Sequence, residues 1–143
     1  MVMAVWMLQI KKRSDTKRGV RFMATICLYQ DTRHEKPLHW MREVFGIGYV
    51  SRRCDGISEL RINGYIQVKN VLLMLKPFIH FKIIQTEALI EACEILSSCT
   101  IGRLSEKQLH RIVDLILVIK NENYTSQNSN NKEMLYGLLG LTP

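Results

Sequence analysis

The chain has 143 residues, of which 47% are hydrophobic, and its 20 lysines and arginines against 13 acids give a formal net charge of +7. A chain of this length is expected to form one domain with a buried core, and no apolar run reaches the roughly 18 residues of a membrane span. The basic balance favours a polyanionic partner only if the cations share one surface. The four cysteines lack metal-site spacing, so we expect reduced thiols.

Two alternating segments open the chain and predict a long β-hairpin over residues 4–30. Trp6, Leu8 and Ile10 alternate with more polar neighbours, and the same period of two recurs over residues 20–28. The connector SDTKRG between them is rich in turn-forming residues. The hairpin is therefore expected to have one apolar face and one polar, basic face.

The next segment predicts a short helix followed by a second hairpin of the same kind. HEKPLHWMREVFG has Pro37 where a first helical turn tolerates it and Gly46 where a helix ends. Two short strands then flank a turn at residues 54–56, again with alternating apolar and polar positions. We expect both hairpins to join one sheet.

Helical patterns fill most of the remaining chain. IQVKNVLLMLKPF predicts a helix until Pro77, FKIIQTEALIEACEILSS predicts another, and the spacing of Ser105 and Gln108 is a capping box that opens a third. NYTSQNSNN is typical of a polar linker, and NKEMLYGLLG predicts a short final helix.

The predicted fold is α+β, in the order ββαββααα. We expect a four-stranded antiparallel sheet, made of two β-hairpins, with helices packed on one face. One domain is expected over residues 1–123, followed by a linker and a short C-terminal helix over residues 124–143.

The polar positions of both hairpins would share the sheet face that the helices leave open. These residue types suit nucleic acid, because Arg and Lys bind phosphates and guanine edges while Asn and Gln bind adenine. Glu59 is the only acid among these strand positions, which argues against the alternative, an ordinary solvated face. The predicted nucleic-acid-binding residues are Gln9, Lys11, Arg13, Arg21, Thr25, Tyr29, Tyr49, Ser51, Arg53, Arg61 and Asn63.

Two motifs are more specific, namely G-x-G-Y-V at residues 46–50 and L-K-P-F-x-x-x-K at residues 75–82. With weaker similarity over nearly the whole chain, they resemble the LAGLIDADG homing endonucleases. The resemblance implies a sheet that binds DNA and, before the first hairpin, a helix that bears the LAGLIDADG motif and ends in a metal-binding acid. Aligning MLQIKKR with the first strand of that family places the acid at Met3, so we expect the motif helix to be absent.

This departure changes the chemistry that the resemblance implies. Phosphodiester hydrolysis in that family depends on carboxylates that hold divalent metal ions, and a thioether cannot replace them. We expect Asp15 and Asp31 to be solvated turn residues, no catalytic residue, no metal site and no cofactor, with Mg²⁺ needed only if the chain is an active endonuclease. Gln30 and Lys82 match a polar pocket residue and a basic residue near the cleaved phosphate; they form either a remnant phosphate pocket or ordinary polar ends of a strand and a helix.

The favoured hypothesis is a catalytically inactive nucleic-acid-binding protein derived from such an endonuclease, in an organellar ribosome or an intron ribonucleoprotein. Loss of the motif helix would leave Trp6 and Leu8 poorly covered, so we expect a protein or ribonucleoprotein partner on that face and no membrane contact. The alternatives are an active DNA endonuclease whose motif helix is encoded elsewhere and an RNA maturase. The resemblance implies a mitochondrial or plastid location.

Overall fold

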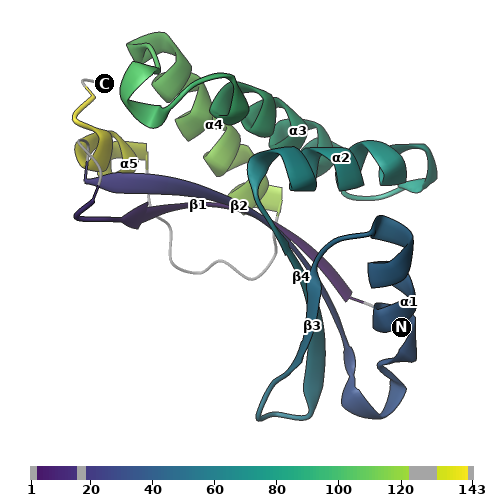
Figure 1. Ribbon diagram of the computed structural model, residues 1–143. Helices are drawn as coiled ribbons and strands as arrows, with labels where there is room; N and C mark the ends of the chain where they lie inside the picture. Colours follow the sequence, from purple (N-terminus) through teal and green to yellow (C-terminus); the bar gives the residue numbers. More distant parts are fainter. Residues whose placement is uncertain (1–2, 16–18, 123–131, 142–143) are drawn as a thin grey trace.

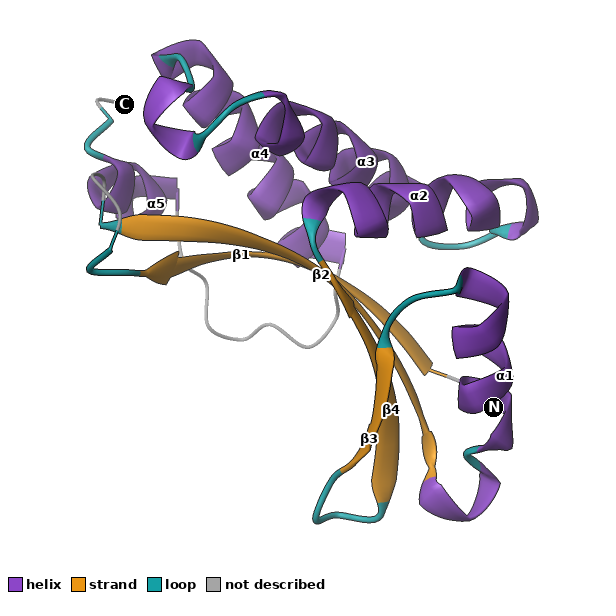
Figure 2. Cartoon of the chain, viewed as in Figure 1, coloured by secondary structure: helices purple, strands orange, loops and turns teal. Residues whose placement is uncertain are grey.

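The computed structural model describes residues 3–15, 19–122 and 132–141, so the linker predicted at residues 123–131 lies outside the described residues. The strands form one four-stranded antiparallel sheet in the order β1-β2-β4-β3 (Figures 1 and 2). This confirms the α+β prediction of one sheet built from two hairpins. The strands are β1 (Met3–Lys12), β2 (Val20–Asp31), β3 (Tyr49–Arg52) and β4 (Ile57–Asn63).

The longer helices lie together on one side of the sheet, as Figure 2 shows for α2, α3 and α4. α1 connects the two hairpins and packs beside β3 and β4. Within the described ranges, no helix is both long enough and apolar enough to cross a membrane. The helices are α1 (Lys36–Phe45), α2 (Tyr65–Leu75), α3 (Ile83–Ser98), α4 (Glu106–Glu122) and α5 (Lys132–Leu139), with short 3-10 turns η1 (Thr32–His34), η2 (Lys76–Phe78) and η3 (Ile101–Arg103).

Local sequence signals set the ends of two helices as predicted. Pro37 lies in the first turn of α1, and Gly46 ends this helix at a φ of 69°. Before α4, the backbone N–H of Gln108 donates to Ser105 Oγ at 3.1 Å, and the backbone N–H of Ser105 donates to Gln108 Oε1 at 2.9 Å. The predicted capping box is therefore confirmed.

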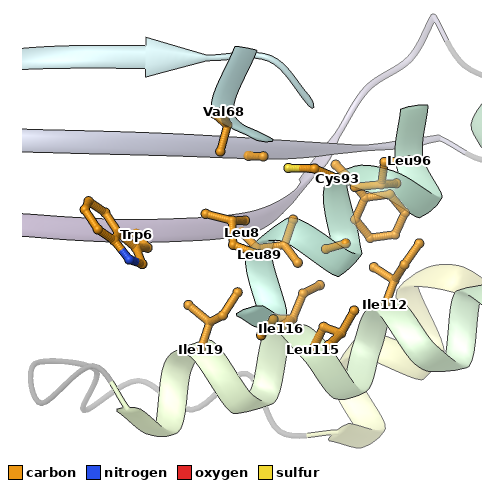
Figure 3. Packing of buried hydrophobic residues seen from close by; sticks show 14 of the residues in the cluster. Trp6, Leu8, Val68, Leu89, Cys93, Leu96, Ile112, Leu115, Ile116 and Ile119 are labelled. Atoms are coloured by element: carbon orange, nitrogen blue, oxygen red, sulfur yellow. The ribbon is translucent and has the colours of Figure 1, made fainter. Parts of the chain in front are cut away.

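The apolar face of the sheet packs against the helices in one core. Phe22 and Ile26 of β2 and Leu60 of β4 are at most 1% exposed. Figure 3 shows side chains from β1, α3 and α4 meeting in this core. α5 joins it through the buried side chains of Leu135 and Leu139, so the C-terminal helix packs on the domain.

Trp6 and Leu8 are well covered, so the prediction that they lack cover is wrong. They are only 4% and 2% exposed, because α3 and α4 both pack on β1. Trp6 Nε1 donates to Thr86 Oγ1 at 2.9 Å, and this hydroxyl donates to the carbonyl of Lys82 at 2.7 Å. Helices of the chain itself thus supply the cover that we had assigned to a partner.

Exposed apolar side chains gather instead around the turn between α2 and α3. Phe78 and Phe81 are 77% and 75% exposed, the highest values among the large apolar residues that the structure describes. α1 lies at the same end of the molecule in Figure 1. We call the surface at this turn the apolar end; it comprises Leu73, Met74, Phe78, Phe81, Ile83 and Ile84.

Candidate nucleic-acid interface

The sheet face opposite the core, here called the open face, carries the polar positions of all four strands. Strand alternation and the antiparallel register fix which residues lie side by side on it. Successive rows across the open face are Lys11/Arg21, Gln9/Met23, Met7/Thr25/Asn63, Val5/Cys27/Arg61/Tyr49 and Met3/Tyr29/Glu59/Ser51.

The arginines just beyond the strand ends are held by aspartates of the adjoining turns. Arg13 donates from Nε and Nη2 to the two carboxylate oxygens of Asp15, both at 3.0 Å. This bidentate contact lowers the pKa of Asp15 and raises that of Arg13. Arg53 Nη2 lies 2.9 Å from Asp55 Oδ2, and its guanidinium carbon is 5.9 Å from the ring centre of Tyr29. Both arginines are thereby fixed in place and partly neutralised.

Sequence reasoning missed these two ion pairs, although a signal for them exists. Each hairpin turn begins with Arg-x-Asp, at residues 13–15 and 53–55. An aspartate two residues after an arginine, in a tight turn, is well placed to fold back onto the guanidinium.

Two positions of the open face are buried and cannot touch a ligand directly. Thr25 is 2% exposed and donates from Oγ1 to Asn63 Oδ1 at 2.9 Å, so it orients the amide of Asn63. Cys27 is fully buried, and burial raises the pKa of its thiol. The Asn63 amide remains exposed for contact.

An acid and an arginine of β4 occupy the middle of the open face. Arg61 Nε lies 3.3 Å from Glu59 Oε1, and these side chains are 32% and 12% exposed. Beside them, burial raises the pKa of Tyr29 to about 12, so its hydroxyl stays protonated. Gly48 lets β3 approach here, because a Cβ at this residue, whose φ is 98°, would lie 3.0 Å from the carbonyl oxygen of Arg61.

Arg52 points to the other side of the sheet and anchors α1. Its Nη2 donates to Glu35 Oε1 at 2.6 Å, and Ser58 Oγ donates to Glu35 Oε2 at 2.5 Å. These hydrogen bonds lower the pKa of Glu35 to about 2. No local sequence pattern indicates this anchor, because Arg52 and Ser58 are 17 and 23 residues away from Glu35.

The same arrangement of sheet and helices occurs in solved structures. The homing endonuclease I-CvuI, in complex with a DNA target, matches with a TM-score of 0.84 over 98% of this chain and 88% of that chain, at 19% identity. An archaeal intron-encoded homing endonuclease complexed with DNA matches at 0.80 over 96% and 87%, at 17% identity. The I-SmaMI LAGLIDADG homing endonuclease, bound to cleaved DNA, matches at 0.74 over 98% of this chain and 46% of that chain, at 17% identity.

The chain has the LAGLIDADG homing-endonuclease fold. The fold suggested by the two sequence motifs is thus confirmed at the level of structure. No family model and no curated protein matches the sequence.

Within this homing-endonuclease fold, Gln30 and Lys82 come from different elements, and no described contact joins them. Gln30 pairs with Ser58 in the register, on the face of the sheet that also carries Leu28, and its Oε1 accepts from the N–H of Asp31 at 3.1 Å. Lys82 precedes α3 at a φ of 61° and is the one non-glycine residue with positive φ in the described ranges. Such strained residues are concentrated at functional sites.

The described acids do not form a metal centre of the kind this fold can hold. The structures of I-CvuI with DNA were solved in the presence of Mg or Ca. In residues 3–15, 19–122 and 132–141, no three His, Cys, Asp or Glu side chains converge as metal ligands. Asp15 is held by Arg13, and Asp31 by Arg33 at 2.8 Å. Each of these two carboxylates therefore faces an arginine and not a second acid.

Proposed function

We propose that the protein binds duplex DNA along the open face and does not cleave it. The observation that carries the proposal is the separation of the two sheet faces. One face is a dry core, whereas the other presents Lys11, Arg21 and Arg61, none of which forms a bidentate pair with a described carboxylate. Phosphates would bind Lys11 and Arg21, and the exposed amides of Gln9 and Asn63 would contact base edges.

The dimensions of the sheet agree with a duplex ligand. β2 has 12 residues, which at about 3.3 Å per residue gives a strand of roughly 40 Å. This is close to one turn of B-DNA, about 34 Å. Two paired strands are narrow enough to enter the major groove. Endonucleases with the same fold have been solved in complex with DNA, which supports DNA as the ligand.

Binding without cleavage follows from the state of the acids near the open face. Metal-assisted cleavage needs carboxylates free to hold the cation against the phosphate. Asp15, Asp55 and Glu59 each lie beside an arginine instead. In this arrangement each carboxylate is engaged by an arginine and is not free to hold a metal ion.

A binding and cleavage assay on labelled duplexes tests the proposal. We expect the affinity for duplex DNA to fall with salt at a log-log slope of about −2, one unit for each of the phosphate-binding residues Lys11 and Arg21, and no product with Mg²⁺. Absence of binding at low salt would overturn the proposal. Cleavage with Mg²⁺ would show that the alternative of an active endonuclease is correct. Tighter binding to structured RNA than to duplex DNA would favour the RNA maturase.

We also propose a protein partner at the apolar end, within an organellar ribosome or intron ribonucleoprotein of a mitochondrion or plastid. Phe78 and Phe81 are highly exposed and belong to a group of exposed apolar side chains. Such a group is typical of a surface that binds another protein. Residues 64–86 contain lysines but no acid, so the occupant would be an apolar helix that carries carboxylates.

Co-sedimentation with purified organellar ribosomes tests this partner. The wild type should sediment with the particle, whereas the double substitution Phe78→Ser and Phe81→Ser should stay at the top of the gradient. The matched control is Ile66→Ser, which changes an exposed side chain at the other end of α2. Equal sedimentation of all three proteins would refute the contact.

A further inference from the structure

Arg61 differs from Arg13 and Arg53 in how its guanidinium donors are used. Arg13 commits Nε and Nη2 to Asp15, and Arg53 commits Nη2 to Asp55. Arg61 has only its Nε near a carboxylate, and among the described residues its two terminal nitrogens have no hydrogen-bond partner. A fork taken up by a carboxylate cannot also make a bidentate contact with a base, so Arg61 can make one whereas Arg13 and Arg53 cannot.

The Nε of Arg61 lies close to Glu59 but does not form a hydrogen bond with it. The two atoms are 3.3 Å apart, but Arg61 Nε is the one buried side-chain nitrogen or oxygen in the described part of the chain that lacks a hydrogen bond. A buried donor without an acceptor is unfavourable. A small rotation of the guanidinium would complete the Nε hydrogen bond to Glu59.

The position of Arg61 in the sheet is that of a base contact. In its row it lies between Cys27, a small buried residue, and Tyr49, which is half exposed. Lys11 and Arg21 form a row near the hairpin turn, where they would meet phosphates. A guanidinium in the middle of a sheet that occupies the major groove would face base edges.

We propose that Arg61 recognises a guanine of the bound duplex and that Glu59 is the residue that positions it. Nη1 and Nη2 donate to guanine O6 and N7, while the carboxylate of Glu59 accepts from Nε. This also explains why the central rows of a basic face contain an acid. The inference rests on the proposed binding of duplex DNA and adds the base that the protein selects.

Site selection from randomised duplexes tests the assignment. The wild type should select guanine at one position, and Arg61→Lys, which keeps the charge but loses the fork, should reduce that preference by about 5- to 150-fold with little change elsewhere. Glu59→Gln should lower the same preference by about threefold or more. The control, Lys11→Ala, should weaken binding to all sequences equally.

A modified DNA makes the test independent of how the variants fold. Replacing the selected guanine by 7-deazaguanine removes the N7 acceptor, so it should weaken wild-type binding but have no further effect on Arg61→Lys. If the wild type binds duplexes yet R61K selects the same guanine as before, the inference fails and DNA binding stands. If the wild type binds duplexes without preference for any base, the inference also fails. If it binds no duplex, the proposed function fails first.

Discussion

The two faces of the sheet are built from alternate residues of the same strands, yet they differ in what fixes each side chain. On the helix-covered face, Phe22, Ile26 and Leu60 are fixed by burial, and burial needs only an apolar group of suitable volume. On the open face, Arg13, Arg53 and Arg61 look equivalent in the sequence, but each has a different relation to a neighbouring acid. Hydrophobic alternation assigns a residue to a face, whereas the availability of a charge depends on individual contacts.

Truncation of the core face should have the largest effect on stability. Phe22→Ala is expected to lower the free energy of unfolding by about 3–5 kcal/mol, because it leaves a cavity between the sheet and the helices. Met23→Ala changes the next residue of β2, on the open face, and should cost much less. Urea denaturation measures both. Equal losses would show that the two faces are not as different as the burial indicates.

Loss of the hydrogen bond between Trp6 of β1 and Thr86 of α3 should have the second-largest effect on stability. Thr86→Val keeps the shape of the side chain but removes the acceptor of the Trp6 Nε1–H, so about 1–3 kcal/mol of stability should be lost. Ser98→Ala removes an exposed hydroxyl bonded within the same helix and serves as the control. A neutral Thr86→Val would mean that packing alone covers Trp6.

The ion pair at the hairpin turn offers a gain of function on the open face. Asp15→Asn releases Arg13 from its carboxylate and should strengthen duplex binding by about three- to tenfold, with about one unit added to the salt slope. Glu91→Gln breaks a similar bidentate pair with Arg111 away from the open face. Its affinity should stay close to that of the wild type. The same gain in both variants would indicate a nonspecific effect of net charge.

The smallest expected effect is a pH dependence from the Glu35 anchor. The pKa of Glu35 is about 2 in the folded protein against an ordinary 4.5. Between these values the unfolded chain binds a proton that the folded chain does not, so the stabilisation is complete above about pH 4.5 and is lost as the pH falls towards 2.

Urea midpoints at pH 6 and pH 3 check this sign. The difference in stability between the wild type and Glu35→Gln should shrink at pH 3. Glu87→Gln, which changes an exposed carboxylate of α3, is the control for charge alone. A difference that grows on acidification would contradict the assignment of the low pKa to the Arg52 and Ser58 contacts.

Much of the fold could be predicted from local sequence signals. Alternation placed Trp6 and Lys11 on opposite faces, and the capping box at Ser105 located the start of α4. The cover over Trp6 could not be predicted, because its partner Thr86 is 80 residues away and nothing local determines which helix lies over β1. The exposure of Phe78 and Phe81 could not be predicted for the same reason. An apolar segment at a helix end has the same sequence pattern whether or not another element packs on it.

The candidate site was predictable in its location but not in its detail. The sequence identified the polar positions of four strands as one surface, because alternation and two hairpins require it. It did not show that Thr25 is buried under Asn63 or that Arg13 and Arg53 are occupied by turn aspartates. These depend on side-chain geometry, although the repeated Arg-x-Asp spacing was a readable signal.

The most direct test is the salt dependence of duplex DNA binding when charge is reversed on one side of the molecule. Lys11→Glu with Arg21→Glu changes the open face, and Arg103→Glu with Lys107→Glu makes the same net change beside α4. We predict a log-log slope of about −2 for the wild type and the control, and a slope near zero for the open-face variant. Equal slopes for all three proteins would contradict the claim that the open face binds DNA.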